Sequence, residues 1–228
     1  MSVLLLVRHG QASWGAADYD RLSATGEEQA RVLGRALAAR GVRPDLLVSG
    51  AMRRHRQTAT AAVSGASWVG EVVEDDGWNE FDHRQMLELH PPALGEGEEL
   101  TRTQFQQWFE EATLRWTSGA HAEEYDESFA AFGARVEAAL RRTVDRLEPK
   151  QTAVVFTSGG PVSWVAASLL SGPSTGAGHA AALWTQLNPV TVNASVTKVV
   201  VGRRGATLVS FNDHGHLEAD DPALITYR

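Results

Sequence analysis

The feature that most constrains the fold of this chain is an alternation between short, wholly apolar runs and longer segments with helical periodicity. Residues 3–7 form an uninterrupted apolar run of strand length, as expected for a strand buried on both faces. Residues 25–40 place apolar side chains at helical spacing, residues 45–49 indicate a second strand, and residues 51–62 indicate a second helix. This order predicts an α/β fold with a mostly parallel sheet and helices on both faces.

The remaining segments continue this pattern around an acidic interruption. Residues 70–100 are crowded with Asp and Glu and broken by Pro and Gly, and we interpret about residues 70–120 as an insertion. Two amphipathic helices come next, whose aromatic stripes are typical of core or lid packing. We therefore predict a three-layer α/β/α sandwich in a single domain, residues 1–228. The later elements are expected at residues 103–116, 128–147 and 160–170 for helices, and at residues 152–157, 195–201 and 206–211 for strands, the last two joined as a hairpin.

Composition excludes several classes of function. The chain has 21 Lys and Arg against 28 Asp and Glu, a formal charge of −7, which disfavours nucleic acid and anionic membranes as partners. It has no cysteine, which excludes disulfides, thiolate nucleophiles and cysteine-ligated metal centres. The N-terminal apolar run is too short for a signal peptide or a membrane span, so we expect a cytoplasmic protein. No feature of the sequence indicates an oligomeric state.

The first group with chemical potential is Arg8-His9-Gly10, at the carboxyl end of the first predicted strand. Ligands of open α/β sheets bind at that edge. The guanidinium of Arg8 matches phosphate oxygens in geometry, and a neutral imidazole such as that of His9 can attack phosphorus to form a phosphoryl-enzyme. The tripeptide alone is a weak signal, because short motifs also arise by chance.

A second basic cluster follows the second predicted strand. Residues 49–59 read Ser-Gly-Ala-Met-Arg-Arg-His-Arg-Gln-Thr-Ala and place several arginines at a strand-to-helix junction. Two arginines from separate loops can hold one phosphoryl group between them. The alternative is a solvated basic helix turn, because charge runs usually face water.

Together, these motifs resemble those of the histidine phosphatase superfamily, also called the phosphoglycerate mutase-like family. The resemblance extends from Val3 to about Leu217 and rests on Arg8-His9-Gly10, on Leu22-Ser23-x-x-Gly26-x-x-Gln29-Ala30, and on Ser49 followed by Arg54 and Gln57-Thr58-Ala59. It implies phosphohistidine chemistry without a metal or other cofactor, on a small phosphorylated molecule. The implied roles are His9 as nucleophile and Arg8 and Arg54 as phosphate ligands, with Arg53 and Arg56 as neighbours that could be confused with Arg54.

The resemblance also implies a carboxylic acid that protonates the leaving oxygen, and Glu80 in Trp78-Asn79-Glu80-Phe81 matches that position. A carboxyl group flanked by Trp78 and Phe81 is one whose pKa desolvation could raise, as a general acid near neutrality requires. The alternative is that Glu80 is one more exposed charge in an acidic loop.

The sequence departs from the family pattern at the third buried strand, where Ser158 stands in the place of an expected second histidine. Ser158, Gly159 and Gly160 could still complete a phosphate cradle, because free amides at the start of a helix favour an anion. The serine brings no positive charge, and losing a preorganised donor costs about 10²- to 10³-fold in rate. Ser13 could offer a further hydroxyl, and His83 could enter the pocket to replace the lost imidazole.

His214 and His216 raise the possibility of a metal site, because an i, i+2 pair in a strand lies on one face. No third ligand is identifiable in the sequence, so we predict no metal and no cofactor.

Four functions follow from these observations. The first is a metal-independent phosphomonoester hydrolase with a phosphohistidine intermediate. The second is a non-catalytic or very weakly active phosphate- or phospholigand-binding protein of the same fold. A mutase is a third, made less probable by Ser158. A serine hydrolase using Ser158 is the fourth, although Phe156 occupies the place where its motif needs glycine.

Overall fold

We describe a computed structural model of the chain, covering residues 1–13, 20–92, 100–172 and 177–227. It contains a six-stranded sheet with the order β3-β2-β4-β1-β5-β6. Strands β3, β2, β4 and β1 run parallel to their neighbours, and the β5–β6 hairpin adds two antiparallel pairings beside β1. The prediction of a mostly parallel sheet is therefore confirmed. The strands are β1 (Ser2–Arg8), β2 (Leu46–Ser49), β3 (Val72–Glu74), β4 (Thr152–Thr157), β5 (Val196–Gly202) and β6 (Gly205–Asp213).

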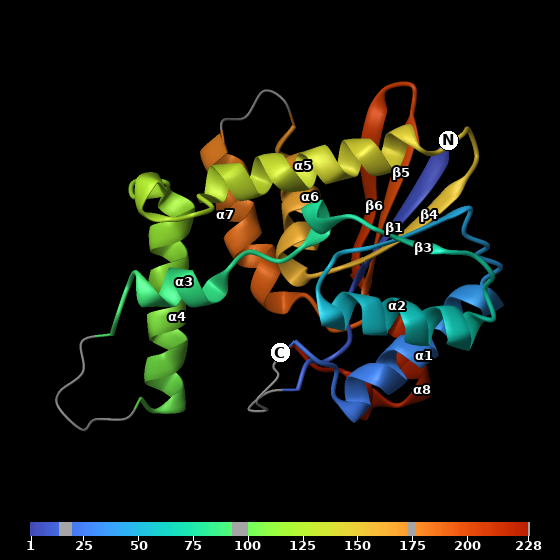
Figure 1. The fold of residues 1–228 in the computed structure, drawn as a ribbon, viewed down its shortest axis with the longest axis horizontal. Coiled ribbons are helices and arrows are strands. Elements are labelled where there is room, and N and C mark those ends of the chain that lie inside the picture. The colour runs from blue at the N-terminus through green and yellow to red at the C-terminus, as the bar shows by residue number, and fades with distance from the viewer. Residues whose placement is uncertain (14–19, 93–99, 173–176, 228) are drawn as a thin grey trace.

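Helices cover both faces of this sheet (Figure 1). One face carries α1 (Ala24–Ala39) and α2 (Arg53–Ala66), with the short α8 (Gly215–Asp220) packed on α1. The opposite face carries α5 (Phe129–Asp145) and α6 (Gly159–Ser171), with α7 (Ala177–Leu187) packed on α6. Helices α3 (His83–Glu88) and α4 (Arg102–Ser118) pack on each other away from the sheet. Short 3-10 turns lie at Asp76–Trp78, Ala122–Glu124, Asn188–Val190 and Pro222–Leu224.

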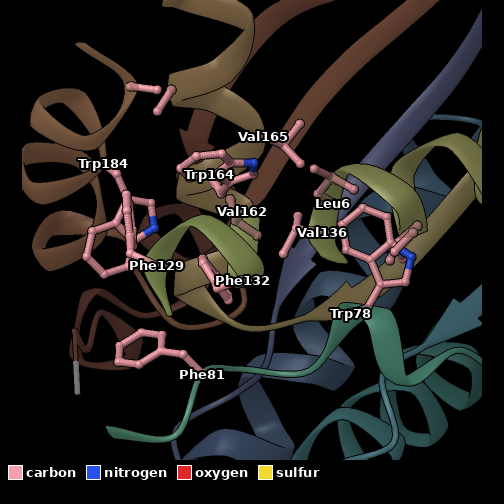
Figure 2. Close-up of a cluster of buried hydrophobic side chains, with 14 of the residues drawn as sticks. Leu6, Trp78, Phe81, Phe129, Phe132, Val136, Val162, Trp164, Val165 and Trp184 are labelled. Carbon is pink, nitrogen blue, oxygen red and sulfur yellow. The ribbon is translucent and has the colours of Figure 1, made fainter. Parts of the chain in front are cut away.

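The larger core lies on the α5–α6 face and is dominated by aromatic side chains (Figure 2). Phe81 stacks on Trp116, with ring centroids 4.6 Å apart, and Phe129 meets Trp184 edge to face at 5.3 Å. Such pairs contribute beyond the area that they bury. The aromatic stripe predicted for residues 103–116 is thus partly core, because Ala112 and Trp116 at its end are buried.

The sequence missed several short elements. Strand β3 lies within residues 70–100, so the first part of the predicted insertion belongs to the sheet. Helices α3 and α8 are too short to carry a helical period, and the Ala-rich α7 has a weak one. Among the described residues, no helix is both long and apolar enough to cross a membrane.

Helix α1 begins at Ala24, one residue before the helix predicted over residues 25–40. Thr25 and Glu28 have capping-box spacing, yet the N-cap is Ser23, whose hydroxyl accepts the Gly26 amide at 3.0 Å. The reason is tertiary, since the Ser23 amide donates to the Gln11 carbonyl and so fixes where the helix begins. Glu28 instead pairs with Arg31 and Arg35 on the helix surface.

Candidate active site

Four of the five predicted catalytic side chains, those of Arg8, His9, Arg54 and Glu80, meet at a cavity of about 360 Å³ beside the carboxyl ends of β1 and β4. Six of the candidate residues singled out in the sequence line it, namely Arg8, His9, Arg54, Glu80, His83 and Gly159. The remaining lining residues come from the loop after β1, from the segment 81–87, from α4 and from the segment before β5: Ala12, Phe81, Arg84, Leu87, Phe105, Phe109, Asn188 and Asn193. Segments remote in sequence therefore build one site.

His9 is held in the form that a nucleophile requires. Its Nδ1 donates to the Gly10 carbonyl at 2.7 Å, which leaves the lone pair on Nε2. Burial and, to a smaller extent, the positive charges of Arg54 and Arg8 lower the pKa of His9 well below 6.5. The ring is 6% exposed and stays neutral at physiological pH, so its Nε2 carries the lone pair that attack requires.

Arg54 follows the first residue of α2 and points toward this nitrogen. Its Nε lies 3.1 Å from His9 Nε2, and its Nη1 pairs with Asp20 at 2.7 Å. Only 5% of the residue is exposed. Arg53 and Arg56, the sequence neighbours considered as alternatives, are exposed, and Arg56 pairs with Glu74. The geometry therefore selects Arg54 as the arginine nearest the nucleophile.

Arg8 reaches the cavity from the end of β1. Its Nη1 donates to the carbonyl oxygens of Thr191 and Tyr227, the latter at 2.6 Å. These two contacts orient the guanidinium from behind, next to Gly159 at the start of α6. An arginine fixed in this way can present its planar donors to a phosphoryl group with little loss of freedom.

Glu80 is partly buried at the cavity wall, and desolvation raises the pKa of its carboxyl group against the opposing effect of the Gly160 amide and Arg54. Its Oε2 accepts the Gly160 amide at 3.1 Å. The Gly160 amide was predicted to face a bound anion. Because it donates to Glu80 instead, Gly159 is the part of the predicted cradle that lines the cavity. A carboxyl group with a raised pKa beside a phosphate site has the property that a proton donor needs.

A polar network fixes the loops that carry these residues. Gly10 donates to the Thr58 hydroxyl, which in turn donates to the Arg54 carbonyl at 2.7 Å. The Gln29 side chain accepts the Gln11 amide at 2.8 Å. Close approach of α1 also explains Gly10, because a Cβ there would lie 2.2 Å from the Gly26 carbonyl oxygen. The glutamines, threonine and glycines of the motif thus position β1 against α1 and α2.

Comparison with known proteins gives the same assignment independently. A family model for the histidine phosphatase superfamily (branch 1) matches residues 4–214. The chain belongs to the histidine phosphatase superfamily.

Curated relatives of this superfamily member match only part of its length. It is 41% identical over 78 residues to a 2,3-bisphosphoglycerate-dependent phosphoglycerate mutase of Thermobifida fusca (strain YX), covering 30% of this chain and 31% of that protein. A mutase of the same description from Rhizobium rhizogenes (strain K84 / ATCC BAA-868) is 33% identical over 95 residues, covering 38% of this chain and 44% of that protein. The alignments therefore span less than half of these relatives.

Solved structures match over nearly the whole chain. A phosphoserine phosphatase mutant from Entamoeba histolytica, in complex with phosphoserine, superposes with a TM-score of 0.67 at 20% identity, covering 95% of this chain and 100% of that one. The complex of a mycobacterial glucosyl-3-phosphoglycerate phosphatase with inorganic phosphate gives 0.62 at 25% identity, covering 94% and 98%. These likenesses confirm the predicted α/β fold of the superfamily.

Two further residues predicted for the superfamily site lie elsewhere. The Ser13 hydroxyl donates to the Leu22 carbonyl at 3.0 Å, and Ser13 does not line the cavity. Ser158 is fully buried and does not line it either. Its hydroxyl contacts the His55 Nε2 at 2.6 Å. His83, suggested as a replacement imidazole, does line the cavity from the start of α3.

His55 is the residue that the sequence analysis missed. It is fully buried, and its ring centroid lies 5.7 Å from that of His9. A serine–histidine contact of 2.6 Å is what a serine hydrolase needs, but the serine is inaccessible. Within the described residues, His55 Nδ1 also lacks the orienting partner of a catalytic triad.

The possible metal pair does not have the predicted geometry. His214 precedes α8 and His216 lies in its first turn, so the two are not on one face of a strand. The His214 Nδ1 donates to the Asn212 carbonyl at 2.7 Å. In the parts of the chain that the structure describes, no three His, Asp or Glu residues are grouped as metal ligands would be.

A larger hollow of about 570 Å³ lies near the ends of β2 and β3. It is lined by charged residues such as Asp75, Arg142 and Arg146, and Asp75 pairs with Arg142 at 2.7 Å. We take the smaller cavity as the candidate active site, because the residues predicted as nucleophile and proton donor, His9 and Glu80, both line it.

Proposed function

We propose that this chain is a metal-independent phosphomonoester hydrolase that acts through a phosphohistidine on a small phosphorylated molecule. The observation that carries the proposal is the His9 ring, which is neutral, fixed through Nδ1, and directed with its Nε2 lone pair at the Arg54 Nε 3.1 Å away. Membership in the superfamily supports phosphatase-type chemistry. The particular reaction and the residue roles are our inference from this geometry.

In the first step, the Arg54 Nε–H turns from His9 Nε2 to a phosphoryl oxygen and so frees the lone pair. Nε2 of His9 then forms a bond to the phosphorus atom, and the bond between phosphorus and the ester oxygen breaks. Arg8 and Arg54 balance the charge on the phosphoryl oxygens, as preorganised donors do. Glu80 gives its proton to the departing oxygen, which leaves as an alcohol. The raised pKa of Glu80 keeps that proton available at a higher pH than in an exposed carboxyl group.

In the second step, water attacks the phosphorus atom of the phosphohistidine. The Glu80 carboxylate accepts a proton from that water, and the bond between nitrogen and phosphorus breaks. The products are inorganic phosphate, a neutral His9 and a protonated Glu80, so the enzyme returns to its starting state. No metal ion or other cofactor is needed for the balance of either step.

The other residues that line the cavity indicate the kind of organic group that a substrate would carry. Leu87 of α3 and Phe105 and Phe109 of α4 line the cavity together with Arg84. Apolar walls with a few polar groups bind apolar portions of ligands and orient them. We propose esters with an apolar or aromatic portion as substrates.

The second candidate function is a phosphate-binding protein without turnover. It is favoured by one observation, namely that Ser158 is buried and brings no charge to the cavity. The two functions differ in covalent chemistry, since only the enzyme forms a phosphohistidine.

The test is hydrolysis of an aryl phosphate by the wild-type chain, with and without chelator, alongside His9→Ala. His121→Ala, an exposed histidine on the surface, is the matched control. We expect turnover that survives chelation and disappears in His9→Ala only, and an acid-labile phosphoryl group trapped on His9. Turnover that is indifferent to His9→Ala would overturn the nucleophile assignment, and inorganic phosphate binding without trapping would favour the second function.

A further inference from the structure

A groove of about 220 Å³ lies between α4 and α7, two helices that pack on each other (Figure 1). Two residues line both this groove and the active-site cavity, namely Phe109 of α4 and Asn188, which directly follows α7. Because these residues come from the two sides of the groove, the groove and the cavity meet at this pair. The proposed mechanism uses the cavity and leaves the groove without a role.

The meeting point lies next to the phosphate end of the cavity. A Cβ placed on Gly159 would lie 3.1 Å from Asn188 Oδ1 and 3.5 Å from the Nε of Arg8. Asn188 and the guanidinium of Arg8 are therefore close neighbours, on either side of one glycine. Since Arg8 is one of the two proposed phosphate ligands, a phosphate ester held there has its organic group beside the entrance of the groove.

One side of α4 continues from the cavity into the groove. Phe105 and Phe109 line the cavity, and Phe109, Thr113 and Leu114 line the groove. Residues three to five positions apart lie on neighbouring parts of a helix surface, and each residue adds 1.5 Å along the axis. Leu114 therefore lies about 7.5 Å farther along the axis than Phe109. A ligand that leaves the cavity past Phe109 can follow α4 over this distance.

Apolar side chains dominate the groove. Phe109 and Leu114 contribute from α4, Trp184 from α7, and Pro189 from the turn after α7. Trp184 is fully buried beneath the groove, whereas Leu114 at the far end is 59% exposed. Covering an exposed leucine with an apolar group removes apolar surface from water, which favours binding.

The polar atoms of the groove are already paired within the protein. The indole N–H of Trp184 donates to the Gly160 carbonyl at 2.9 Å. The hydroxyls of Thr113 and Thr185 donate to carbonyl oxygens of their own helices at 2.7 and 2.8 Å. The charged residue that lines the groove is Glu110, whose carboxylate disfavours a second anionic group on the ligand. The groove therefore suits an uncharged, apolar group.

We propose that this groove binds the far part of the substrate's organic group. The preferred substrates are then phosphate monoesters whose leaving group carries an uncharged apolar chain or ring too long for the cavity alone. With the phosphoryl group at His9, the organic group passes between Phe109 and Asn188 and lies along α4 toward Leu114. This inference rests on the proposed function and adds a class of substrate to it.

The test is a series of 4-alkylphenyl phosphates, from methyl to heptyl, at concentrations where each ester is monomeric. The phenol leaving group is the same throughout, so only the length of the apolar chain changes. Burying one methylene completely gives about a fourfold gain in binding, and remote binding energy raises kcat/KM. We expect kcat/KM to rise about two- to fourfold per methylene until the chain passes Leu114. A flat series in the wild type would overturn the inference.

Two pairs of variants locate the effect in the groove. Thr185 lines the groove and not the cavity, so Thr185→Phe should lower kcat/KM for the heptyl ester about tenfold, the loss of two or so buried methylenes, and leave the methyl ester unchanged. Thr60→Phe, at an exposed threonine of α2 whose hydroxyl also bonds within its helix, should keep the whole series. Leu114→Ala should end the rise at a shorter chain, whereas Leu170→Ala, at a leucine that is 57% exposed on α6, should not. Equal losses for the methyl and heptyl esters would overturn the inference.

Binding of 4-alkylphenyl phosphonates, which are not hydrolysed, separates failure of this inference from failure of the proposed function. If the wild type hydrolyses the methyl ester but gains nothing from longer chains, only the groove is misassigned. If the wild type hydrolyses none of the esters, the enzymatic function is wrong, and calorimetry tests the groove. The heptyl phosphonate should then still bind about tenfold more tightly than the methyl phosphonate, and Thr185→Phe should remove the difference. Equal affinities in the wild type, or a dimer in sedimentation that Thr185→Phe dissociates, would overturn the inference.

Discussion

Replacing Glu80 by glutamine separates the proton of this side chain from its other contacts. Glutamine keeps the size and one carbonyl oxygen, so it can still accept the Gly160 amide that now donates to Glu80 at 3.1 Å. It cannot protonate a leaving oxygen. General acid catalysis contributes about 10²- to 10⁴-fold, so kcat/KM for an alkyl phosphate, which reports the phosphoryl-transfer step alone, should fall by that factor. An activated aryl phosphate, whose oxygen leaves as an anion, should lose far less.

The same substitution should change the dependence of stability on pH. Burial raises the pKa of Glu80, so the folded chain holds a proton that the unfolded chain releases. The stability that this provides is present below the unfolded pKa and is lost as the pH rises through the folded pKa. Each unit between the two values corresponds to about 1.4 kcal/mol. Glu80→Gln should therefore be more stable than the wild type at neutral pH and lose that advantage in acid.

Comparing alkyl with aryl esters, and neutral with acid pH, tests both expectations for Glu80→Gln. We expect kcat/KM to fall more for alkyl than for aryl esters, and urea denaturation to show the stability gain at pH 7 but not at acid pH. Glu137→Gln, an exposed carboxylate on α5, should change neither. An equal loss in kcat/KM for alkyl and aryl esters would refute the role of Glu80 as proton donor, and a variant destabilised at neutral pH would refute the account of its burial.

Three other perturbations test the geometry elsewhere. Gly10→Ala should destabilise the fold by about 1–3 kcal/mol in thermal melting, because the new Cβ would lie 2.2 Å from the Gly26 carbonyl oxygen. Gly178→Ala is the control and should be neutral or stabilising, because a Cβ there would have no atom within 4 Å. Burial lowers the pKa of His216 from 6.5 to about 4, so the stability that the neutral ring provides above pH 6.5 is lost as the pH falls toward 4. In urea titrations, His216→Gln should therefore reduce the acid-induced loss in the free energy of unfolding by about 3 kcal/mol. Leu87→Ala should reduce kcat/KM for an aryl phosphate about tenfold and leave inorganic phosphate binding unchanged; weaker phosphate binding would instead indicate a disturbed site.

Buried strands and long amphipathic helices could be predicted from the sequence because their patterns are local. The run at residues 3–7 is strand β1, and the hairpin predicted after residue 195 is β5–β6. The start of α1 could not be predicted, because Ser23 is fixed by Gln11 of another loop. Competing local caps are decided by such tertiary contacts.

The candidate site could be predicted from the sequence where residues with suitable chemistry directly follow a predicted strand. Arg8 ends strand β1, His9 follows it, and Arg54 is the second residue of α2, so the edge of the sheet brings them to one cavity. The Gly160 amide was misjudged, because nothing local shows that Glu80 accepts it. The role of a helix N-terminus therefore depends on which anion reaches it first.

His55 shows the limit of reading motifs one at a time. It follows Arg54 directly, so it leaves α2 in a different direction and gives no local sign of a partner. The contact between His55 and Ser158 could be anticipated only by considering Gly50, His55 and Ser158 together, because the sheet order brings their segments side by side.

The fork of Arg54 explains why lysine would not be an equivalent residue there. Its Nε donates to His9 while its Nη1 pairs with Asp20, so two nitrogens of one rigid plane serve two partners in different directions. The positive charge of Arg54 lowers the pKa of His9 and would also attract a phosphoryl group. Both effects favour the proposed attack, because that attack needs a neutral ring beside a bound anion. A lysine would supply the charge without the fixed second donor, and the ring would lose the contact that directs its Nε2. The charge and the orientation of the nucleophile therefore depend on a single planar group.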